Sequence, residues 1–481
     1  MATVTSSEFA PRAALAALVL FAVSTAIMLV TGPSLMSIGL VALALLPVVI
    51  YLALRWPLAS TFGLYVLLVP FDNLLNTGSF GTMTKLLGMV AGAFMLLHVV
   101  RRRLVSFESP PLRVLAVLAL WMLASTFWAL DQKVALAGMA TFAGLMLLYA
   151  VLTMVPISRA QLNMLFLLIV AGGVCAAAYG AHMFMHDPTF AQESLQTRRL
   201  IIHVGQYEID PNHFSDALIF PAAIAAMWGL RTRSFFARLA CVGILGLLVT
   251  AILYSGSREG LSAMGLIAAY YFWRSQYRLK LAIAIGAVVA VVSTVQTSVF
   301  LRFSSALDTG GSGRTSIWAV ALEAAKHRLL QGYGLGNFTQ AFNLYYLKIH
   351  QPYPYGWDSP AHNLVLHYLV ELGVIGLALI GAFIAMQFLS LRAIDRNNEL
   401  YDYRIVMEAS LVAIVVVSFA IDLFQYKYAW LIFAMVALVR NAAVGVPARQ
   451  MKPLPPLPQP QLSPGLKPFG PRSPSGVYGR T

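Results

Sequence analysis

The amino-acid sequence predicts an all-α protein that crosses a membrane many times. Hydrophobic residues make up 59% of its 481 residues and charged residues only 11%, well below the roughly one quarter that is typical of a soluble domain. Apolar runs recur along most of the chain, while the polar residues gather in a few connections between them. We therefore expect a polytopic integral membrane protein with about 12 to 14 transmembrane helices, rather than a soluble domain with a single anchor.

Apolar runs of roughly 17 to 25 residues mark the expected spans. They lie near residues 13–31, 34–54, 57–71, 82–100, 112–129, 134–155, 161–185, 214–230, 239–254, 260–273, 281–301, 362–391, 405–424 and 428–444. The runs at 57–71 and 260–273 are short, so tilted or re-entrant helices stay open there. The first run lacks a convincing cleavage site, so we expect a retained span rather than a signal peptide.

The basic residues predict the orientation of these spans. With the N-terminus in the cytoplasm, 22 of the 33 Lys and Arg residues lie on the cytoplasmic side, as the positive-inside rule requires. Both termini are then cytoplasmic and the long connection 302–361 is outside. The net charge of +14 is therefore a topology signal, and nucleic-acid binding is not expected. Cys175 and Cys241 lie in apolar runs and indicate neither a disulfide nor a metal site.

Three parts follow from the distribution of polar residues. Residues 1–185 are expected to form an N-terminal transmembrane bundle. Residues 186–445 form a second membrane region, which contains the long extracytoplasmic loop 302–361 and most of the polar candidates. Residues 446–481 hold 10 of the 24 prolines and are expected to be a disordered cytoplasmic tail. Partner docking and a plain spacer are both open for this tail.

The loop 302–361 contains the pattern of an amphipathic helix. Between Thr315 and Leu330 the apolar residues fall on one face: Ile317, Val320, Ala321, Ala324 and Ala325. Such a helix is expected to lie on the membrane surface. The glycines of Gly332–Gly336 then stop it and reverse the chain against the membrane. We do not expect a nucleotide loop there, because this stretch follows a helix instead of a strand.

Three residues indicate the chemistry. Arg258 follows an apolar run directly, Arg314 stands at the start of the amphipathic helix, and His362 lies where the loop re-enters the membrane. Two fixed cations can hold a pyrophosphate, and a neutral imidazole can take a proton from a hydroxyl. Because all three residues are expected on one side of the bilayer, they suggest glycan transfer from a lipid pyrophosphate rather than transport. Snorkelling of Arg314 to lipid headgroups stays open.

Other polar residues support two interpretations each. Asp210 and Asn212 precede a span, where they can begin its helix or form a wall of a sugar-binding cavity. His182 and His186 are one helical turn apart but lack an obvious third ligand, so no metal site is expected. His98 and His367 are interpreted as structural or interfacial residues. Three acidic residues near spans should face protein or water, because lipid excludes them: Asp216, Glu371 and Asp422.

As an ordered set, these motifs resemble the O-antigen ligase and polymerase superfamily of bacterial envelope proteins. The resemblance covers roughly residues 200–390. The residues that carry it are Ser255-Gly256-Ser257-Arg258, Gly313-Arg314 with Trp318, Gly332 to Gly336, and Ala361-His362-Asn363 followed by Glu371-Leu372-Gly373. Members of that superfamily usually have twelve spans, slightly fewer than the runs counted above.

The resemblance implies an enzyme of the glycosyltransferase type. Such proteins take a glycan from undecaprenyl pyrophosphate at the outer face of the bacterial inner membrane, with inversion and without metal or cofactor. The resemblance maps the two essential arginines of the family to Arg258 and Arg314 and its essential histidine to His362. We add Asp210, Asn212 and Asn363 as candidate substrate-binding residues. The implied partners are the lipid-linked donor, a sugar or lipid A core acceptor, membrane lipids and polysaccharide-assembly proteins.

The acceptor is open at this point. A ligase would deliver the glycan to the lipid A core, a polymerase would deliver it to another repeat unit for an O-antigen or exopolysaccharide, and protein-directed relatives use Ser or Thr. A transporter or lipid-linked glycan flippase is a further alternative. Such proteins often have two similar halves with polar residues near the middle of the membrane. Here the halves are not visibly alike, and the polar residues gather in outer loops.

Overall fold

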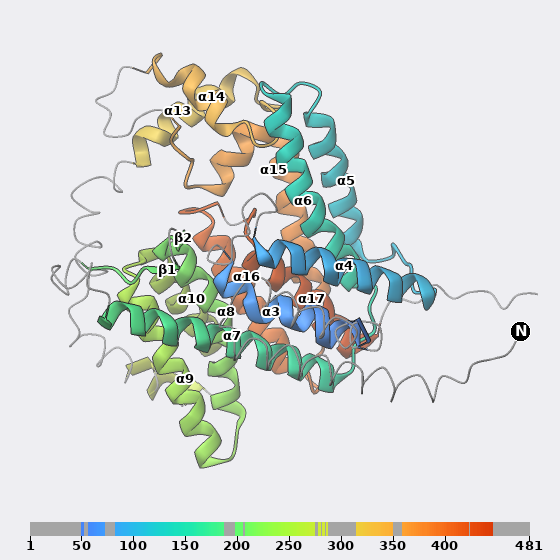
Figure 1. The fold of residues 1–481 in the computed structure, drawn as a ribbon, viewed down its shortest axis with the longest axis vertical. Helices are drawn as coiled ribbons and strands as arrows, with labels where there is room; N and C mark the ends of the chain where they lie inside the picture. Colours follow the sequence, from blue (N-terminus) through green and yellow to red (C-terminus); the bar gives the residue numbers. More distant parts are fainter. Residues whose placement is uncertain are drawn as a thin grey trace, which may run out of the picture. The chain divides into compact units, whose positions relative to one another are not determined.

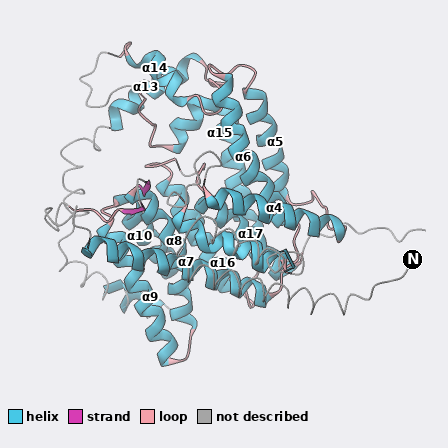
Figure 2. Cartoon of the chain, viewed as in Figure 1, coloured by secondary structure: helices cyan, strands magenta, loops and turns pink. Residues whose placement is uncertain are grey.

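A computed structural model describes residues 50–51, 56–72, 82–186, 198–204, 207–274, 278–279, 281–283, 285–286, 314–349, 358–422 and 424–445. Within these residues the chain is almost entirely helical (Figure 1; Figure 2), and the one sheet is a two-stranded hairpin. The predicted all-α fold class is confirmed.

The elements follow one another with short connections. In chain order they are a π-helical turn (Leu58–Phe62), α3 (Gly63–Leu68), a 3₁₀ turn (Val69–Phe71), α4 (Met83–Arg101), α5 (Pro110–Ser125), α6 (Gln132–Thr153), α7 (Arg159–His186), β1 (Ile202–Val204), β2 (Tyr207–Ile209), α8 (Pro211–Arg231), α9 (Phe235–Tyr254), α10 (Arg258–Arg274), α13 (Arg314–His327), α14 (Phe338–Tyr346), α15 (Leu364–Leu391), α16 (Tyr401–Val417) and α17 (Lys427–Val444). The strands β1 and β2 pair antiparallel, with Ile202 opposite Ile209.

Many of these helices can cross a bilayer. Seven described helices, α4, α6, α7, α8, α9, α15 and α17, are long and apolar enough, and shorter apolar helices cover Leu58–Phe71 and Pro110–Ser125. All of them coincide with expected spans, so the polytopic membrane architecture is confirmed. The expected spans 13–31 and 34–54, most of 281–301, and the tail 446–481 lie outside the described residues, apart from Ile50 and Tyr51.

The core is built around α8 and α17, which are the most buried of the seven helices. In α17 every residue from Ala429 to Val439 is buried, as expected for a helix that is apolar all round. Aromatic rings join it to α6 and α15: Tyr149, Phe383, Phe424, Trp430 and Phe433. Asn441 then donates hydrogen bonds to the carbonyl oxygens of Thr153 and Val155, which fixes α17 to the end of α6.

The amphipathic helix is confirmed as α13, but protein rather than lipid covers its apolar face. All five apolar residues of the predicted face are buried. They pack against α14 and α15, together with Tyr333, Phe338 and Phe342. Figure 1 shows α13 and α14 next to each other, over the start of α15. The apolar face is covered by protein because a second helix, α14, follows in the same loop.

The glycine stretch after α13 reverses the chain against α15 instead of against the membrane. α15 is interrupted at Gly373, whose φ of 68° is left-handed, and the backbone groups freed there need partners. Three hydrogen bonds supply them: Tyr333 N–H to Val370 O, Gly334 N–H to Glu371 O, and Val374 N–H to Leu329 O. A Cβ on Gly373 would lie 2.1 Å from Leu330 O. The motif residues Gly332–Gly336 and Glu371–Gly373 thus form one structural unit.

Candidate active site

Arg314 is fixed at the junction of three elements. It is the first residue of α13, and its Nη1 lies 3.0 Å from Glu259 Oε1 at the start of α10. The same Nη1 donates a hydrogen bond of 2.8 Å to the carbonyl oxygen of Ala420. Both side chains are largely buried, with exposed fractions of 17% for Arg314 and 8% for Glu259. A buried pair with this geometry holds the guanidinium in place.

Arg258 precedes Glu259 and begins α10. The turn before it is rigid: Gly256 has a φ of 67°, Ser255 Oγ bonds to Ile252 O, and Ser257 Oγ accepts the Gly260 N–H. Gly260 brings α10 close to α8, because a Cβ there would lie 1.7 Å from Ser215 Oγ. The two candidate arginines are therefore coupled through Glu259, which neighbours Arg258 in sequence and pairs with Arg314 in space.

His362 stands in a strained turn between two fixed neighbours. Its φ of 47° is left-handed, which is uncommon for a residue other than glycine and costs of order 1 kcal/mol or more. On one side, Trp318 Nε1 donates to Ala361 O at 3.1 Å. On the other side, Asn363 caps α15 by accepting the Leu366 N–H, and its Nδ2 donates to Phe419 O. These contacts hold the backbone of His362 in its turn.

The segment after α16 forms hydrogen bonds with the turn that contains His362. α16 was expected to continue to residue 424, but it ends at Val417. The segment beyond it accepts three hydrogen bonds from the site: Leu364 N–H to Ser418 O, Asn363 Nδ2 to Phe419 O, and Arg314 Nη1 to Ala420 O. Continued helix would have satisfied these carbonyl groups internally. Because α16 ends early, a single backbone segment forms hydrogen bonds both with Arg314 and with the turn that contains His362.

The electrostatic surroundings keep His362 neutral. Its pKa is lowered from the ordinary histidine value, first by burial and then by the Arg314 charge, while Asp210 and Glu259 act in the opposite direction. The net effect is a neutral imidazole near pH 7, the form that can accept a proton. The four groups belong to the starts of α8, α10, α13 and α15, so these helix ends meet in one polar cluster, called here the candidate site.

Asp210 and Asn212 lie in this cluster through their own helix. Asp210 caps α8 by accepting the N–H groups of Asn212 (2.8 Å) and His213 (3.4 Å), so the helix-initiation interpretation is confirmed. Asn212 Oδ1 accepts from Arg199 Nη2 at 2.9 Å, and Arg199 Nε donates to Ser255 O at 2.8 Å. Arg199 thereby joins the start of α8 to the turn before Arg258. The sugar-contact role of Asp210 and Asn212 stays a prediction, as does that of Asn363.

Sequence reasoning passed over His213 and Tyr426. The His213 ring lies 4.0 Å from the Tyr426 ring, measured between centroids, and its Nδ1 is 3.1 Å from the Tyr428 hydroxyl. The electrostatic field of His362 also acts on His213. A sequence signal existed, because His213 follows Asn212 in the cap of α8. The tyrosines gave no signal, since aromatic residues at the start of a span are common.

A second polar cluster lies beside the candidate site. His367 Nε2 is 3.1 Å from Glu371 Oε1 and 3.5 Å from Asp422 Oδ2, and Glu371 Oε1 also accepts the N–H of Phe338 at the start of α14. The expectation that Glu371 and Asp422 face protein is confirmed, and the structural role of His367 stays a prediction. Asp216 is likewise buried in protein. The His182 and His186 rings stack 4.6 Å apart, and the described residues bring no third metal ligand to them.

An apolar cavity of about 750 Å³ begins next to the cluster. Its walls are mainly α4 and α6, which contribute small residues such as Gly88, Gly92 and Gly144. Its polar end contains Lys427, whose Nζ contacts Asp72 Oδ1 at 2.5 Å and two threonine hydroxyl groups. Tyr426 lines this end, and its ring contacts the His213 ring in a tilted arrangement. The cavity and the candidate site therefore share a wall.

Comparison with known proteins gives one finding. Residues 243–381 match the sequence model of a family described as O-antigen ligase. The match contains Arg258, Arg314 and His362 and ends inside α15, so it covers the polar cluster apart from the start of α8 and the segment after α16. A search of curated proteins found no match to the chain. The resemblance seen in the sequence is confirmed at the level of the superfamily.

Proposed function

We propose, from the premise that residues 243–381 belong to the O-antigen ligase and polymerase superfamily, that the protein transfers a glycan from undecaprenyl pyrophosphate to an acceptor hydroxyl. The observation that supports this most is that Arg314 and His362 lie in one polar cluster with Glu259 and Asp210. A held cation beside a neutral base is the arrangement that glycosyl transfer from a pyrophosphate needs.

In the proposed reaction the acceptor oxygen attacks the anomeric carbon of the donor sugar. The bond from that carbon to the pyrophosphate oxygen breaks, and the configuration inverts. His362 takes the proton of the acceptor hydroxyl, while Arg258 and Arg314 stabilise the negative charge that develops on the leaving pyrophosphate. Glu259 holds Arg314 through Nη1 alone. Among the described residues, Arg314 Nη2 and Nε have no hydrogen bond, so both can donate to a phosphate oxygen.

The apolar cavity between α4 and α6 fits the lipid part of this donor. Its volume of about 750 Å³ and its small-residue walls suit a long isoprenoid chain. Lys85 and Lys427 at its polar end suit the phosphates that join the chain to the sugar. Tyr426 lies between this end of the cavity and His213. A lipid tail in the cavity would therefore place its headgroup next to the candidate site.

The proposed orientation places the candidate site outside the cytoplasm, in the inner membrane of a bacterium. Arg231 ends α8, Arg274 ends α10, and Arg392 follows α15, all at the helix ends away from His362. The positive-inside rule assigns such ends to the cytoplasm. Both termini would then be cytoplasmic, with residues 1–185 as an N-terminal bundle, 186–445 as the catalytic region and 446–481 as a tail.

The test is a deletion strain whose surface polysaccharide is separated on gels. Loss of polymer from the lipid A core with normal chain length would identify a ligase, whereas single repeat units in place of long chains would identify a polymerase. An unchanged polysaccharide pattern, with no lipid-linked glycan accumulating, would refute the proposed transfer. Complementation with the wild-type chain is the control for secondary mutations.

A further inference from the structure

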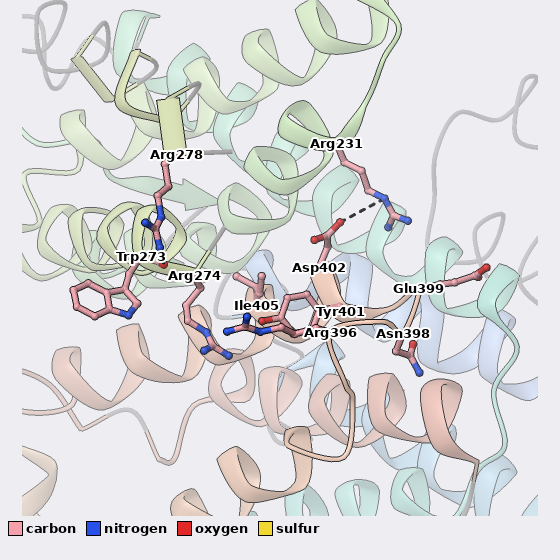
Figure 3. A pocket seen from close by; sticks show the side chains of 10 residues that line it. All are labelled: Arg231, Trp273, Arg274, Arg278, Arg396, Asn398, Glu399, Tyr401, Asp402 and Ile405. Carbon is pink, nitrogen blue, oxygen red and sulfur yellow. Dashed lines mark hydrogen bonds and ion pairs between the residues drawn. The ribbon is translucent and has the colours of Figure 1, made fainter. Parts of the chain in front are cut away.

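A second pocket, distinct from the candidate site, is rich in arginine. It has a volume of about 740 Å³, and its lining residues are Arg231, Trp273, Arg274, Arg278, Arg396, Asn398, Glu399, Tyr401, Asp402 and Ile405. Figure 3 shows their side chains, which come from the ends of α8 and α10, from Arg278 beyond α10, from the connection between α15 and α16, and from the start of α16. Four guanidinium groups from three parts of the chain therefore line one space.

This pocket lies at the opposite helix ends from the candidate site. α8 begins beside Asp210 and ends at Arg231 after 21 residues, and α10 begins at Arg258 and ends at Arg274 after 17 residues. At 1.5 Å per residue these lengths are about 30 Å and 25 Å, close to the roughly 30 Å hydrocarbon thickness of a bilayer. The pocket and the candidate site are therefore expected at opposite membrane faces.

Part of the positive charge in the pocket is already paired. Arg231 Nε lies 3.6 Å from Asp402 Oδ2, and Arg274 Nη2 lies 3.4 Å from Glu408 Oε2. Glu399 pairs with Arg159 outside the pocket, so it does not neutralise the lining arginines. Among the described residues, Arg278 makes one hydrogen bond, to Trp273 O.

Arg396 is exposed, and among the described residues no hydrogen bond or ion pair engages its guanidinium. The lining thus keeps positive charge available to an anion. Topology alone accounts for arginines on this face, but it does not account for their convergence around a cavity.

Exposed aromatic rings surround this end of the bundle. Trp273 lines the pocket and is 77% exposed, and Phe235 and Phe236 at the start of α9 are 69% and 80% exposed. Large aromatic side chains at helix ends typically lie at the headgroup level of a bilayer. Because α9 follows Arg231 after a short connection, the arginines and these rings share that level.

We propose that this pocket binds a phosphate group, and that an anionic membrane lipid supplies it. Arginine forks match phosphate oxygens geometrically and pair with them through two parallel hydrogen bonds. The aromatic rim favours a lipid headgroup over a free anion, because it places the pocket where phospholipid phosphates lie. The proposal is independent of the transfer reaction, since it concerns the other end of the bundle and needs no glycan donor.

The test measures lipid-dependent stability of the full-length protein in an uncharged detergent. We expect phosphatidylglycerol to raise the Tm and phosphatidylcholine to leave it unchanged. In Arg278→Gln/Arg396→Gln the apparent affinity for phosphatidylglycerol should fall about tenfold or more. Arg396→Gln alone should reduce it partly and cannot unfold the protein through a lost internal pair, because Arg396 has none among the described residues.

The matched control is Arg101→Gln/Arg102→Gln, which removes the same charge from exposed arginines outside the pocket. It should keep the full response to phosphatidylglycerol. Equal losses in the pocket and control variants would overturn the proposal, since the arginines would then act only as general surface charge. A response to inorganic phosphate as large as the response to phosphatidylglycerol, lost in the pocket variant, would overturn the lipid as source.

Discussion

At the scale of single residues, His362 combines backbone strain with a shifted proton affinity. Two fixed neighbours hold its left-handed turn, and burial with the Arg314 charge lowers its pKa. In the proposed role of base, His362 would need no conformational search, because its backbone is already held in place. The same contacts explain why Asn363 accompanies His362 in the motif: it caps α15 and ties the turn to Phe419.

His362→Ala should abolish glycan transfer while the purified protein still binds the lipid pyrophosphate donor. In the proposed reaction the imidazole accepts the proton of the acceptor hydroxyl, whereas the arginines supply most of the affinity for the donor. In the wild type, turnover should fall as the pH falls through the His362 pKa, because protonation removes the base. Since that pKa is lowered from about 6.5, the acid limb should lie below the ordinary histidine range. Near-normal turnover in His362→Gln would reduce His362 to a positioning residue.

Arg314→Lys should lose about 10²-fold or more of the transfer rate with normal membrane insertion. Lysine can keep the ion pair with Glu259 but lacks the further N–H donors that a phosphate would need. The control is Lys326→Gln on the same helix, whose ammonium is 71% exposed and pairs only with Glu323 among the described residues. It should leave the rate unchanged. Full activity of Arg314→Lys would show that this arginine serves as a structural charge alone.

At the scale of elements, the broken helix α15 and the glycine segment after α13 stabilise each other. Gly373→Ala should lower the Tm and the yield of folded protein, because an added Cβ would lie 2.1 Å from Leu330 O in a left-handed backbone. Gly381→Ala in the same helix is the matched control. Its Cβ meets nothing within 4 Å, so it should leave stability unchanged or raise it by about 1 kcal/mol. Thermal unfolding followed by tryptophan fluorescence measures both, and equal Tm values would contradict the interlock.

Hydropathy predicted the helices well because a bilayer leaves few alternatives to a long apolar helix. α4, α6, α7 and α17 each lie within a few residues of their expected bounds. The same reasoning could not place α13 correctly, since an amphipathic pattern is the same whether lipid or protein covers its apolar face. The helix α14 that covers it has a pattern too short to stand out. The early end of α16 could not be predicted either, because it depends on the hydrogen bonds that Arg314 and Asn363 donate to the segment after this helix.

The candidate site, too, could be predicted from the sequence only in part. Arg258, Arg314 and His362 could be named from the sequence because charged and polar residues are rare in this chain. Glu259 was not among the predicted site residues, yet in the structure it pairs with Arg314. His213 and Tyr426 were missed because their proximity depends on α8 and α17 packing together, a contact between residues about 200 positions apart. Long-range packing of this kind cannot be predicted from a single sequence.

At the scale of the whole molecule, the proposed roles of both ends of the helix bundle depend on its orientation in the membrane. Basic residues end α8 and α10 away from His362, and the loop with α13 and α14 lies at the His362 side. The test needs one labelling site at each end, and the structure supplies two exposed positions, Lys348 and Asn397.

Lys348→Cys should react with a membrane-impermeant maleimide in intact spheroplasts, while Asn397→Cys should react only after permeabilisation. Each variant is made in a background with Cys175→Ser and Cys241→Ser, which removes both natural thiols. The physical reason is the positive-inside rule: moving the arginines near Asn397 to the outer face would oppose it at several connections at once. Equal labelling of both positions after permeabilisation controls for local accessibility. If the reagent reached Asn397→Cys in intact spheroplasts but not Lys348→Cys, His362 would face the cytoplasm. Transfer at the outer face would then be impossible, whatever the chemistry of the cluster.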